Sequence, residues 1–425
     1  MKGHLENERS SWITFIIIFA AYTIVSMTKN TYSTAIATIV SPEVHLFDKS
    51  DAGLINAGFY LLYSVAQLFG GVLVEKIPPF KMLLIGLFGA LVTNIAMAMT
   101  DSFVVMLVAW TLNGLLQFGV WPVILKLTTT VVMPEHRQKA MSYLFLAYPL
   151  GSALSYLFAG VLLRFFSWPS LFWSSVITLG IMIASVLWLM AHLKKKMVPG
   201  PEILPVELGD NKAEKAQTVS PEPMPFFRML FASGLIFLTV PALIRCMLDI
   251  GLKNWVPTMI MECYDVPPSF ANLLTTVLIV VNLSGLFIVN WIYPKRCKNI
   301  ATIMGIFFTI CLPLLLLIVF TGKVHLFFIL ISLALTTTFT MSSSQVINVI
   351  MPAAFSAQGK TGLIASFINS FGGLGVMIAN YAYGLLAEHF GWTITAVIWL
   401  ALGAIAVIFC FLATPFWKRF TQNNI

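Results

Sequence analysis

One pattern repeats along almost the whole sequence: a run of about 20 mostly apolar residues, followed by a short polar or Pro/Gly-containing break. A helix of that length crosses the hydrocarbon core of a bilayer. The runs lie near residues 12–39, 53–74, 80–100, 103–130, 139–163, 169–192, 229–256, 270–292, 299–320, 325–350, 361–387 and 392–415. They predict an all-α membrane protein with twelve transmembrane helices.

The composition agrees with a lipid environment. Hydrophobic residues make up 59% of the chain and charged residues 10%, whereas an ordinary soluble domain has roughly 25% charged residues. The run that starts at Trp12 is too long for the apolar region of a signal peptide, so we expect it to remain as the first helix. The five cysteines show no paired spacing, and we predict neither a disulfide nor a metal site.

A single long polar stretch divides the chain. Residues 194–227 are polar and rich in proline, and they predict a cytoplasmic linker. They separate an N-terminal six-helix half, residues 1–193, from a C-terminal six-helix half, residues 228–425.

The two halves resemble each other in sequence. Residues 160–168 run from Gly to Trp at the end of the fifth span, and residues 384–392 do the same at the end of the eleventh. A Met-Pro pair closes the fourth span at Met133 and the tenth at Met351. Such parallel similarity predicts two halves related by a pseudo-twofold axis, with substrate at the midplane between them.

Lys and Arg residues are distributed unevenly between the two sides of the predicted spans. An even number of spans puts both termini on one side, and that side holds eighteen of these residues: Lys2, Arg9, Lys76, Lys81, Arg137, Lys139, Lys194, Lys195, Lys196, Lys212, Lys215, Arg228, Lys295, Arg296, Lys298, Lys360, Lys418 and Arg419. The other side holds three: Lys49, Arg164 and Lys323. The excess predicts a multi-pass protein of the cytoplasmic (inner) membrane with both termini in the cytoplasm. The net charge of +8 therefore reflects topology, and we expect no nucleic-acid partner.

A few charged residues remain inside the predicted spans. The cations are Lys29, Lys126, Arg245 and Lys253, and Asp249 is the one acid well within a span. Because an ionisable side chain in the bilayer costs several kcal/mol, each of these residues needs a specific reason to be there. Together they carry net positive charge, which favours an anionic ligand.

Lys29 lies about 16 Å before the predicted outer end of the first span, too deep for its ammonium group to reach the interface easily. Tyr22, Ser26, Lys29 and Ser33 follow a helical spacing and share one polar face. This face either lines a substrate cavity or forms a polar seam that joins helices. We favour the cavity, because an unpaired buried lysine is rarely structural.

Arg245, Asp249 and Lys253 are spaced by four residues and share a face of the seventh span. Arg245 and Asp249 are either functional or a structural ion pair, and Lys253 is expected to extend toward the membrane interface. Lys126 in the fourth span either lines the cavity or extends toward the cytoplasm.

Five segments, spread from end to end, follow motifs of one transporter family. They are Gly71-Val-Leu-Val-Glu75-Lys76, Gln117-Phe-Gly-Val-Trp121-Pro122 with Lys126, Lys29-Asn30, Trp255-Val-Pro257-Thr258 and Phe390-Gly391-Trp392. The chain thus resembles the organophosphate:phosphate antiporter branch of the major facilitator superfamily, the glycerol-3-phosphate transporter-like proteins. The resemblance implies the major facilitator fold and a gating motif at Gly71, Glu75 and Lys76.

The chain departs from this family at its basic positions. Aligned on the shared motifs, the residues found there are Thr28, Gln67, Tyr148 and Asp249. An arginine holds phosphate through a bidentate fork that these side chains cannot reproduce. We expect Arg245 and Lys29 to take over the contact with the anion.

We therefore predict a secondary active transporter of a small organic anion, a carboxylate or a phosphate ester, working by alternating access. Proton coupling and anion exchange both remain open. The predicted substrate-binding residues are Lys29, Arg245, Tyr22, Tyr63, Gln67, Tyr148 and Lys126, and Asp249 is the candidate proton carrier.

Two other functions fit parts of the sequence. An exporter of amphipathic, drug-like compounds would suit the aromatic content, and a non-transporting membrane sensor would signal through the linker. We expect no enzymatic activity, because no nucleophile–base set or metal cluster lies at a suitable depth. No cofactor is expected, and the predicted partners are the organic anion and membrane lipid, with the protein a monomer.

Overall fold

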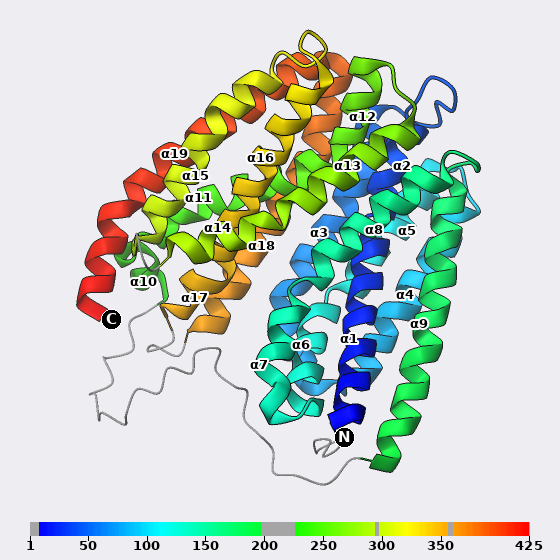
Figure 1. Ribbon diagram of the computed structural model, residues 1–425, viewed down its shortest axis with the longest axis vertical. Coiled ribbons are helices and arrows are strands. Elements are labelled where there is room, and N and C mark those ends of the chain that lie inside the picture. The colour runs from blue at the N-terminus through cyan, green and yellow to red at the C-terminus, as the bar shows by residue number, and fades with distance from the viewer. Residues whose placement is uncertain (1–7, 197–225, 294–296, 356–359, 425) are drawn as a thin grey trace. The chain divides into compact units, whose positions relative to one another are not determined.

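The computed structural model describes residues 8–196, 226–293, 297–355 and 360–424. Within these ranges every regular element is a helix (Figure 1), which confirms the predicted all-α class. Eleven helical segments in this part of the chain have the length and hydropathy needed to cross a membrane. The remaining predicted span, 53–74, lies within the 28-residue helix α3 (Lys49–Lys76).

By their internal contacts the residues form two compact units. The first unit contains residues 1–206 and 254–280, and the second contains residues 207–253 and 281–425. The helices that begin in the first unit are α1 (Glu8–Lys29), α2 (Thr31–Ile39), α3, α4 (Pro79–Ala98), α5 (Phe103–Gln117), α6 (Val120–Val131), α7 (Pro134–Leu144), α8 (Ala147–Leu162), α9 (Pro169–Lys196) and α13 (Pro268–Asn282). Most of α12 (Leu252–Tyr264) belongs to the same unit.

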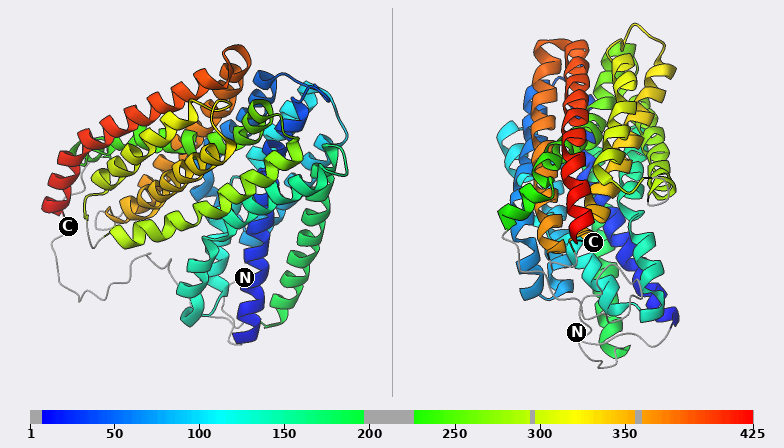
Figure 2. Two further views of the ribbon diagram at one scale, coloured as in Figure 1. Left: turned by 45° about the horizontal axis from the view of Figure 1, so that its top comes forward. Right: turned by 90° about the vertical axis from the view of Figure 1, so that its left-hand side faces the viewer.

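The second unit contains the remaining helices. They are α10 (Phe226–Ala232), α11 (Leu235–Cys246), the π-helical turn η1 (Met247–Gly251), α14 (Ser284–Ile292), α15 (Ile300–Ile318), α16 (Leu326–Gln345), the π-helical turn η2 (Val346–Ile350), α17 (Met351–Ala353), α18 (Thr361–His389) and α19 (Gly391–Asn424). In this unit α15 packs against α16 and α19, and α11 packs against α18 and α19 (Figure 2).

The compact units and the predicted halves differ in one segment. Residues 254–280 belong to the C-terminal half in sequence but pack with the N-terminal helices. Asn272 donates a hydrogen bond from Nδ2 to the backbone oxygen of Thr34 (3.2 Å), and the Nζ atom of Lys49 lies 3.0 Å from the carboxylate of Glu262. The division into residues 1–193 and 228–425 stays a prediction, and most of the predicted linker lies outside the described residues.

Small residues allow the helices of the first unit to pack closely. A Cβ atom at Gly114 on α5 would overlap the backbone of Phe59 on α3, and one at Gly151 on α8 would overlap the backbone of Thr23 on α1. Close approach of helix backbones at small residues is typical of membrane helices, where it replaces the hydrophobic driving force of water. These contacts fix α1, which carries Lys29, between its neighbours.

Several spans are interrupted rather than continuous. The first breaks at Asn30 between α1 and α2, and the fourth breaks at 118–119 between α5 and α6. The seventh and tenth contain the π-helical turns η1 and η2. Such turns occur frequently at functional sites. The deep charged residues of the first and seventh spans lie at these interruptions.

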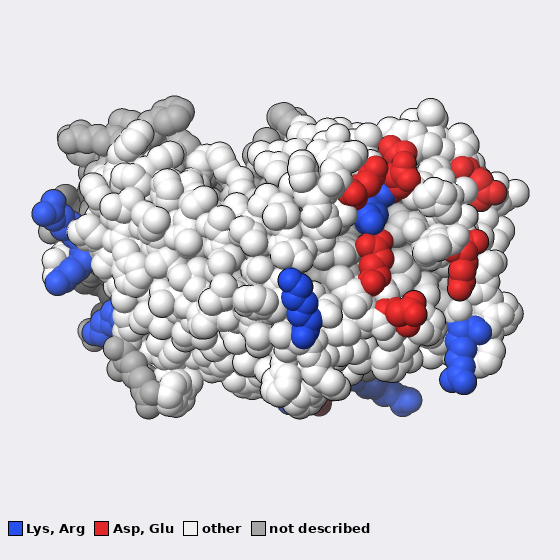
Figure 3. All heavy atoms as spheres, turned by 90° about the horizontal axis from the view of Figure 1, so that it is seen from above, with Lys and Arg blue, Asp and Glu red and all other residues white. Residues whose placement is uncertain are grey.

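Acidic side chains gather at one end of the first unit. They come from the segment after α2, from the first turn of α3, from the loop between α4 and α5, and from α12 and its following turn: Glu43, Asp48, Asp51, Asp101, Glu262 and Asp265. Figure 3 shows acidic side chains clustered on part of the surface seen from above. The distribution of Lys and Arg predicts this end to be the outer one, and the orientation stays a prediction.

Candidate functional site

Lys29 is the last residue of α1 and is buried, with 8% of its surface exposed. Its Nζ atom donates a hydrogen bond to the hydroxyl of Tyr63 (3.3 Å) and lies 4.4 Å from the centroid of the same ring. Among the described residues, no carboxylate lies within ion-pair distance of this ammonium group. A buried positive charge is thus held by an aromatic ring and a hydroxyl.

The polar face of the first span divides into two parts. Ser33 accepts a hydrogen bond from Asn56 (3.1 Å), and Asn30 donates hydrogen bonds to the backbone oxygen of Ser26 (2.7 Å) and to Ser152 (3.1 Å). These residues form a polar seam that joins α1 and α2 to α3 and α8. Lys29 lies apart from the seam, in contact with Tyr63.

Aromatic rings extend from Lys29 along α1, α3 and α6. Tyr63 stacks on Phe59, with ring centroids 5.9 Å apart. Tyr22, seven residues before Lys29 on α1, lies near Tyr63 and packs against Trp121 of α6 at a centroid distance of 4.8 Å. We call Tyr22, Lys29, Tyr63 and Trp121 the lysine–aromatic cluster. In this cluster the positive charge of Lys29 lies next to a series of aromatic rings.

The sequence named Tyr22, Lys29 and Tyr63 as site residues, and the structure brings these three together. Trp121 was expected only as part of a family motif, although its place next to Pro122 in the fourth span offered a signal.

The other predicted residues of the N-terminal half lie on three helices. Gln67 is half-buried on α3, one turn after Tyr63. Lys126 is half-buried on α6, and Tyr148 on α8 packs against the hydrophobic core that includes Tyr22. Their roles in binding stay predictions.

The predicted gating motif, Gly71, Glu75 and Lys76, lies on the last turns of α3. Its side chains are outside the described residues.

In the second unit, Arg245, Asp249 and Lys253 form an ion-pair triad around η1. The Asp249 carboxylate lies 3.5 Å from Nη1 of Arg245 and 2.6 Å from Nζ of Lys253. Arg245 and Asp249 are 7% and 2% exposed. Lys253, which we expected to extend toward the membrane interface, points instead to Asp249.

Two further contacts define the environment of Arg245. Its Nη2 atom donates to the sulfur of Cys246 (2.6 Å), and its Nε atom is buried without a hydrogen-bond partner in the part of the chain that the structure describes. Because one carboxylate pairs with two cations, the triad carries one formal positive charge in excess. An anion near Arg245 would satisfy the remaining donor and the remaining charge.

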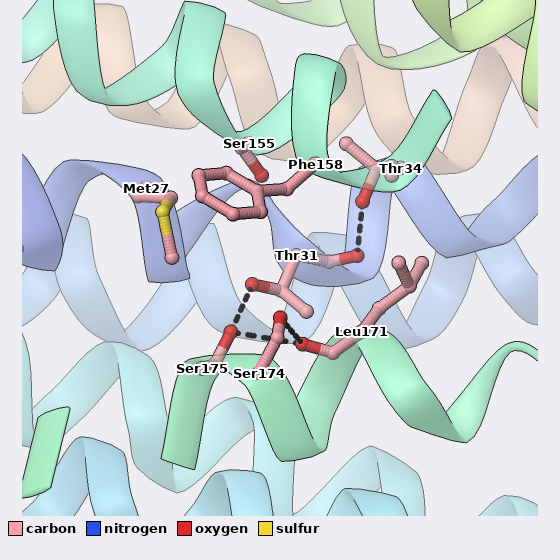
Figure 4. A pocket seen from close by; sticks show the side chains of 9 residues that line it. Met27, Thr31, Thr34, Ser155, Phe158, Leu171, Ser174 and Ser175 are labelled. Carbon is pink, nitrogen blue, oxygen red and sulfur yellow. Dashed lines mark hydrogen bonds between the residues drawn. The ribbon is translucent and has the colours of Figure 1, made fainter. Parts of the chain in front are cut away.

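A small pocket in the first unit lies beside the break at Asn30 and is lined mainly by hydroxyl groups (Figure 4). Thr31 and Ser175 share a hydrogen bond (2.8 Å), Thr34 donates to the backbone oxygen of Thr31 (2.8 Å), and Ser174 donates to that of Leu171 (2.7 Å). None of the lining side chains is cationic, and hydroxyls that donate their protons to backbone oxygens, as those of Thr34 and Ser174 do, offer an anion only lone pairs, which repel it. This pocket is therefore a poor anion site, unlike the region around Lys29.

Comparison with known proteins identifies the family to which the chain belongs. A family model described as Major Facilitator Superfamily matches residues 14–356. The chain belongs to this superfamily.

Two relatives cover nearly the full length of the chain, and a third covers about half of it. A protein named probable hexose phosphate transport protein from Chlamydia pneumoniae is 21% identical over 422 residues, spanning 96% of this chain and 92% of the relative. The protein of the same name from Chlamydia trachomatis is 22% identical over 96% of this chain and 91% of its own. A chloroplastic ascorbate transporter from Arabidopsis thaliana is 25% identical over 52% of this chain and 42% of its own.

Solved structures of the superfamily share the fold at low sequence identity. A D-xylose–proton symporter aligns with a TM-score of 0.71 and 12% identity, over 96% of this chain and 98% of that one. A bacterial homologue of the human lysosomal transporter Spinster, inward-facing and unoccupied, aligns with a TM-score of 0.66 and 15% identity over 98% of both chains.

These findings confirm the predicted fold and the predicted family. The full-length relatives named as hexose phosphate transport proteins agree with the predicted resemblance to the organophosphate:phosphate antiporter branch. The chain is a multi-pass membrane transport protein of the major facilitator superfamily, and it is not an enzyme.

Proposed function

We propose that the protein is a secondary active transporter of a phosphorylated sugar or a closely similar organic anion, working by alternating access. The full-length relatives named for hexose phosphate support the sugar phosphate, and the deep positive charges support an anion. Lys29 and Lys126 lie within the spans of the N-terminal half, and the Arg245–Asp249–Lys253 triad adds one net positive charge in the C-terminal half.

The observation that carries this proposal is the environment of the Lys29 ammonium group. Its ammonium group is buried and has Tyr63, an uncharged side chain, as its partner. A structural lysine at such depth would normally be neutralised by a carboxylate, because an uncompensated charge in the membrane costs several kcal/mol. The charge is stabilised fully only when an anion binds, which is what a substrate phosphate would do.

Arg245 and Asp249 have separate roles in the proposal. Arg245 binds the anion, since its unpartnered Nε atom remains available as a donor. Asp249 carries the coupling proton: protonation removes its negative charge and frees both neighbouring cations, which raises the affinity for the anion. Anion exchange without protons is the other mode, and the Asp249→Asn variant distinguishes the two.

The mode of phosphate contact differs from that of the resembling family. Lys29 offers a compact point charge beside Thr28, where the family has an arginine fork. An ammonium group attracts an anion by its charge and imposes little geometry on it. This protein should therefore discriminate less between phosphate and carboxylate groups than a protein with an arginine at this position. Competition by organic acids in the transport assay measures this difference.

The decisive experiment is counterflow into liposomes that contain the purified protein. We expect labelled glucose 6-phosphate to be taken up against unlabelled glucose 6-phosphate, and glucose to be ignored. The variant Lys29→Ala should abolish uptake, whereas Lys81→Ala, which removes an exposed lysine of α4, should not. Normal uptake by the Lys29→Ala protein, or no uptake of any sugar phosphate by the unaltered protein, would contradict the proposal.

A further inference from the structure

Trp121 is the residue through which α6 joins the lysine–aromatic cluster. Its ring centroid lies 4.8 Å from that of Tyr22 and 5.9 Å from that of Phe145. The side chain packs against the hydrophobic core of the first unit but stays partly exposed. Part of the indole surface is therefore free to contact a ligand.

The two faces of α6 show what this exposed surface borders. Val123, Ile124 and Leu127 are buried against α1 and α4. Trp121 and Lys126 are both half-exposed and lie about 140° apart around the helix, on the two edges of the face opposite those residues. An ammonium group avoids contact with lipid tails, so the edge that carries Lys126 borders protein or water rather than lipid. Trp121, about 8 Å away along the helix axis, borders α1 through its contact with Tyr22.

Helices α1 and α6 place Lys29 on one side of the Tyr22–Trp121 pair and Lys126 on the other. The backbone N–H of Met133, after α6, donates to Ser11 near the start of α1 (3.0 Å), so the helices run antiparallel. Lys29 therefore lies beyond Tyr22 in one direction, and Lys126 lies beyond Trp121 in the other. Side chains lean toward the N-terminus of their own helix, which inclines both lysines toward the Tyr22–Trp121 contact.

A ligand that fits this arrangement has an anionic group for a lysine and an apolar face for the indole. The pyranose ring of a sugar presents such a face, because its axial C–H bonds carry partial positive charge and the face of an aromatic ring is negative. Inorganic phosphate and small phosphate esters without a ring lack this second feature. A Trp–Tyr pair beside a cation thus recognises a ring-containing phosphate better than phosphate itself.

We propose that Trp121 is a specificity-determining residue whose indole supports the sugar ring while Lys29 binds the phosphate. This inference rests on the proposed function and assigns a part of the site that the charged residues do not explain. Tyr22 packs against the indole, with ring centroids 4.8 Å apart, and helps to hold it in place.

The test compares two competitors of labelled glucose 6-phosphate uptake: glucose 6-phosphate itself and methyl phosphate, which has no ring. In Trp121→Leu we expect the affinity for glucose 6-phosphate to fall about tenfold, within the range of aromatic contacts, while that for methyl phosphate changes less than about twofold. Trp121→Phe, which keeps a smaller ring, should lie between. Trp188→Leu is the matched control, because Trp188 on α9 is 53% exposed and outside the cluster.

Each outcome decides a different point. Equal losses for both competitors would show that Trp121 only maintains the fold, and no loss for either would show that it does not contact the sugar; both overturn this inference and leave the proposed function standing. If the unaltered protein takes up anions but no sugar phosphate, the proposed function fails and the inference falls with it. Thermal unfolding in detergent confirms that each variant is folded.

Discussion

The triad around η1 allows a prediction that separates a structural ion pair from a functional one. Removing Arg245, Asp249 or both tests it. Both side chains are more than nine-tenths buried, so a charge left without its partner is poorly hydrated. Removing one partner of a buried pair costs about 3–5 kcal/mol in free energy of unfolding, and removing both costs much less.

Lys253 makes the two single variants unequal. In Arg245→Ala the Asp249 carboxylate keeps Lys253 as a partner at 2.6 Å, so the loss should fall below that range. In Asp249→Ala two cations on one helix face lose their shared counter-ion, so the loss should reach about 3–5 kcal/mol or more. The structure therefore predicts an asymmetry that a simple two-residue pair would not show.

The assay is denaturant unfolding of the purified variants in mild detergent, combined with counterflow. Arg164→Ala, at the predicted outer side, is the control for loss of a cation. Equal losses in the two single variants would refute the role given to Lys253. A stable Arg245→Ala/Asp249→Ala protein that still transports would refute the proposed binding role of Arg245.

Three further predictions concern coupling, gating and topology. Asp249→Asn should retain exchange of substrate for substrate but lose acceleration by a pH gradient, and loss of both activities would contradict a role in proton coupling alone. Glu75→Ala should slow turnover at nearly unchanged KM, because the motif is remote from the midplane; a large rise in KM at constant kcat would show the reverse. Reporter insertions should place Ser11 in the cytoplasm and Asp48 outside, and a cytoplasmic Asp48 would overturn the orientation.

The sequence predicted the spans well, because a bilayer imposes a minimum apolar length on every crossing helix. It did not predict where the spans are interrupted. The π-helical turns η1 and η2 carry no distinctive composition, since an extra residue in a helical turn is stabilised by the packing around it. The sequence also did not predict that residues 254–280 pack with the N-terminal helices, because this packing depends on contacts with residues distant in the sequence.

The charged residues of the candidate site were predictable, because a charge inside a membrane span costs free energy and needs a specific reason to be there. Lys29 and Asp249 stand out in any apolar run, and the spacing by four residues placed Arg245 beside Asp249. Contacts between helices were not predictable in this way. Tyr63 was expected near the site, but its direct contact with Lys29 depends on how α3 packs on α1. Trp121 was missed as a site residue because an aromatic residue in a membrane span is usually ordinary packing.

The passage of the chain between the two compact units has a mechanical consequence. The boundary after Lys253 follows η1 by two residues, and the boundary after Val280 precedes the break at Leu283 by three. The chain therefore crosses between the two compact units beside turns that lack the regular helical hydrogen-bond ladder, and such turns bend at lower cost than an intact helix. One of these turns, η1, carries Asp249 between its two cations. A bend at η1 would change the distances in the triad, and with them the free energy of protonating Asp249.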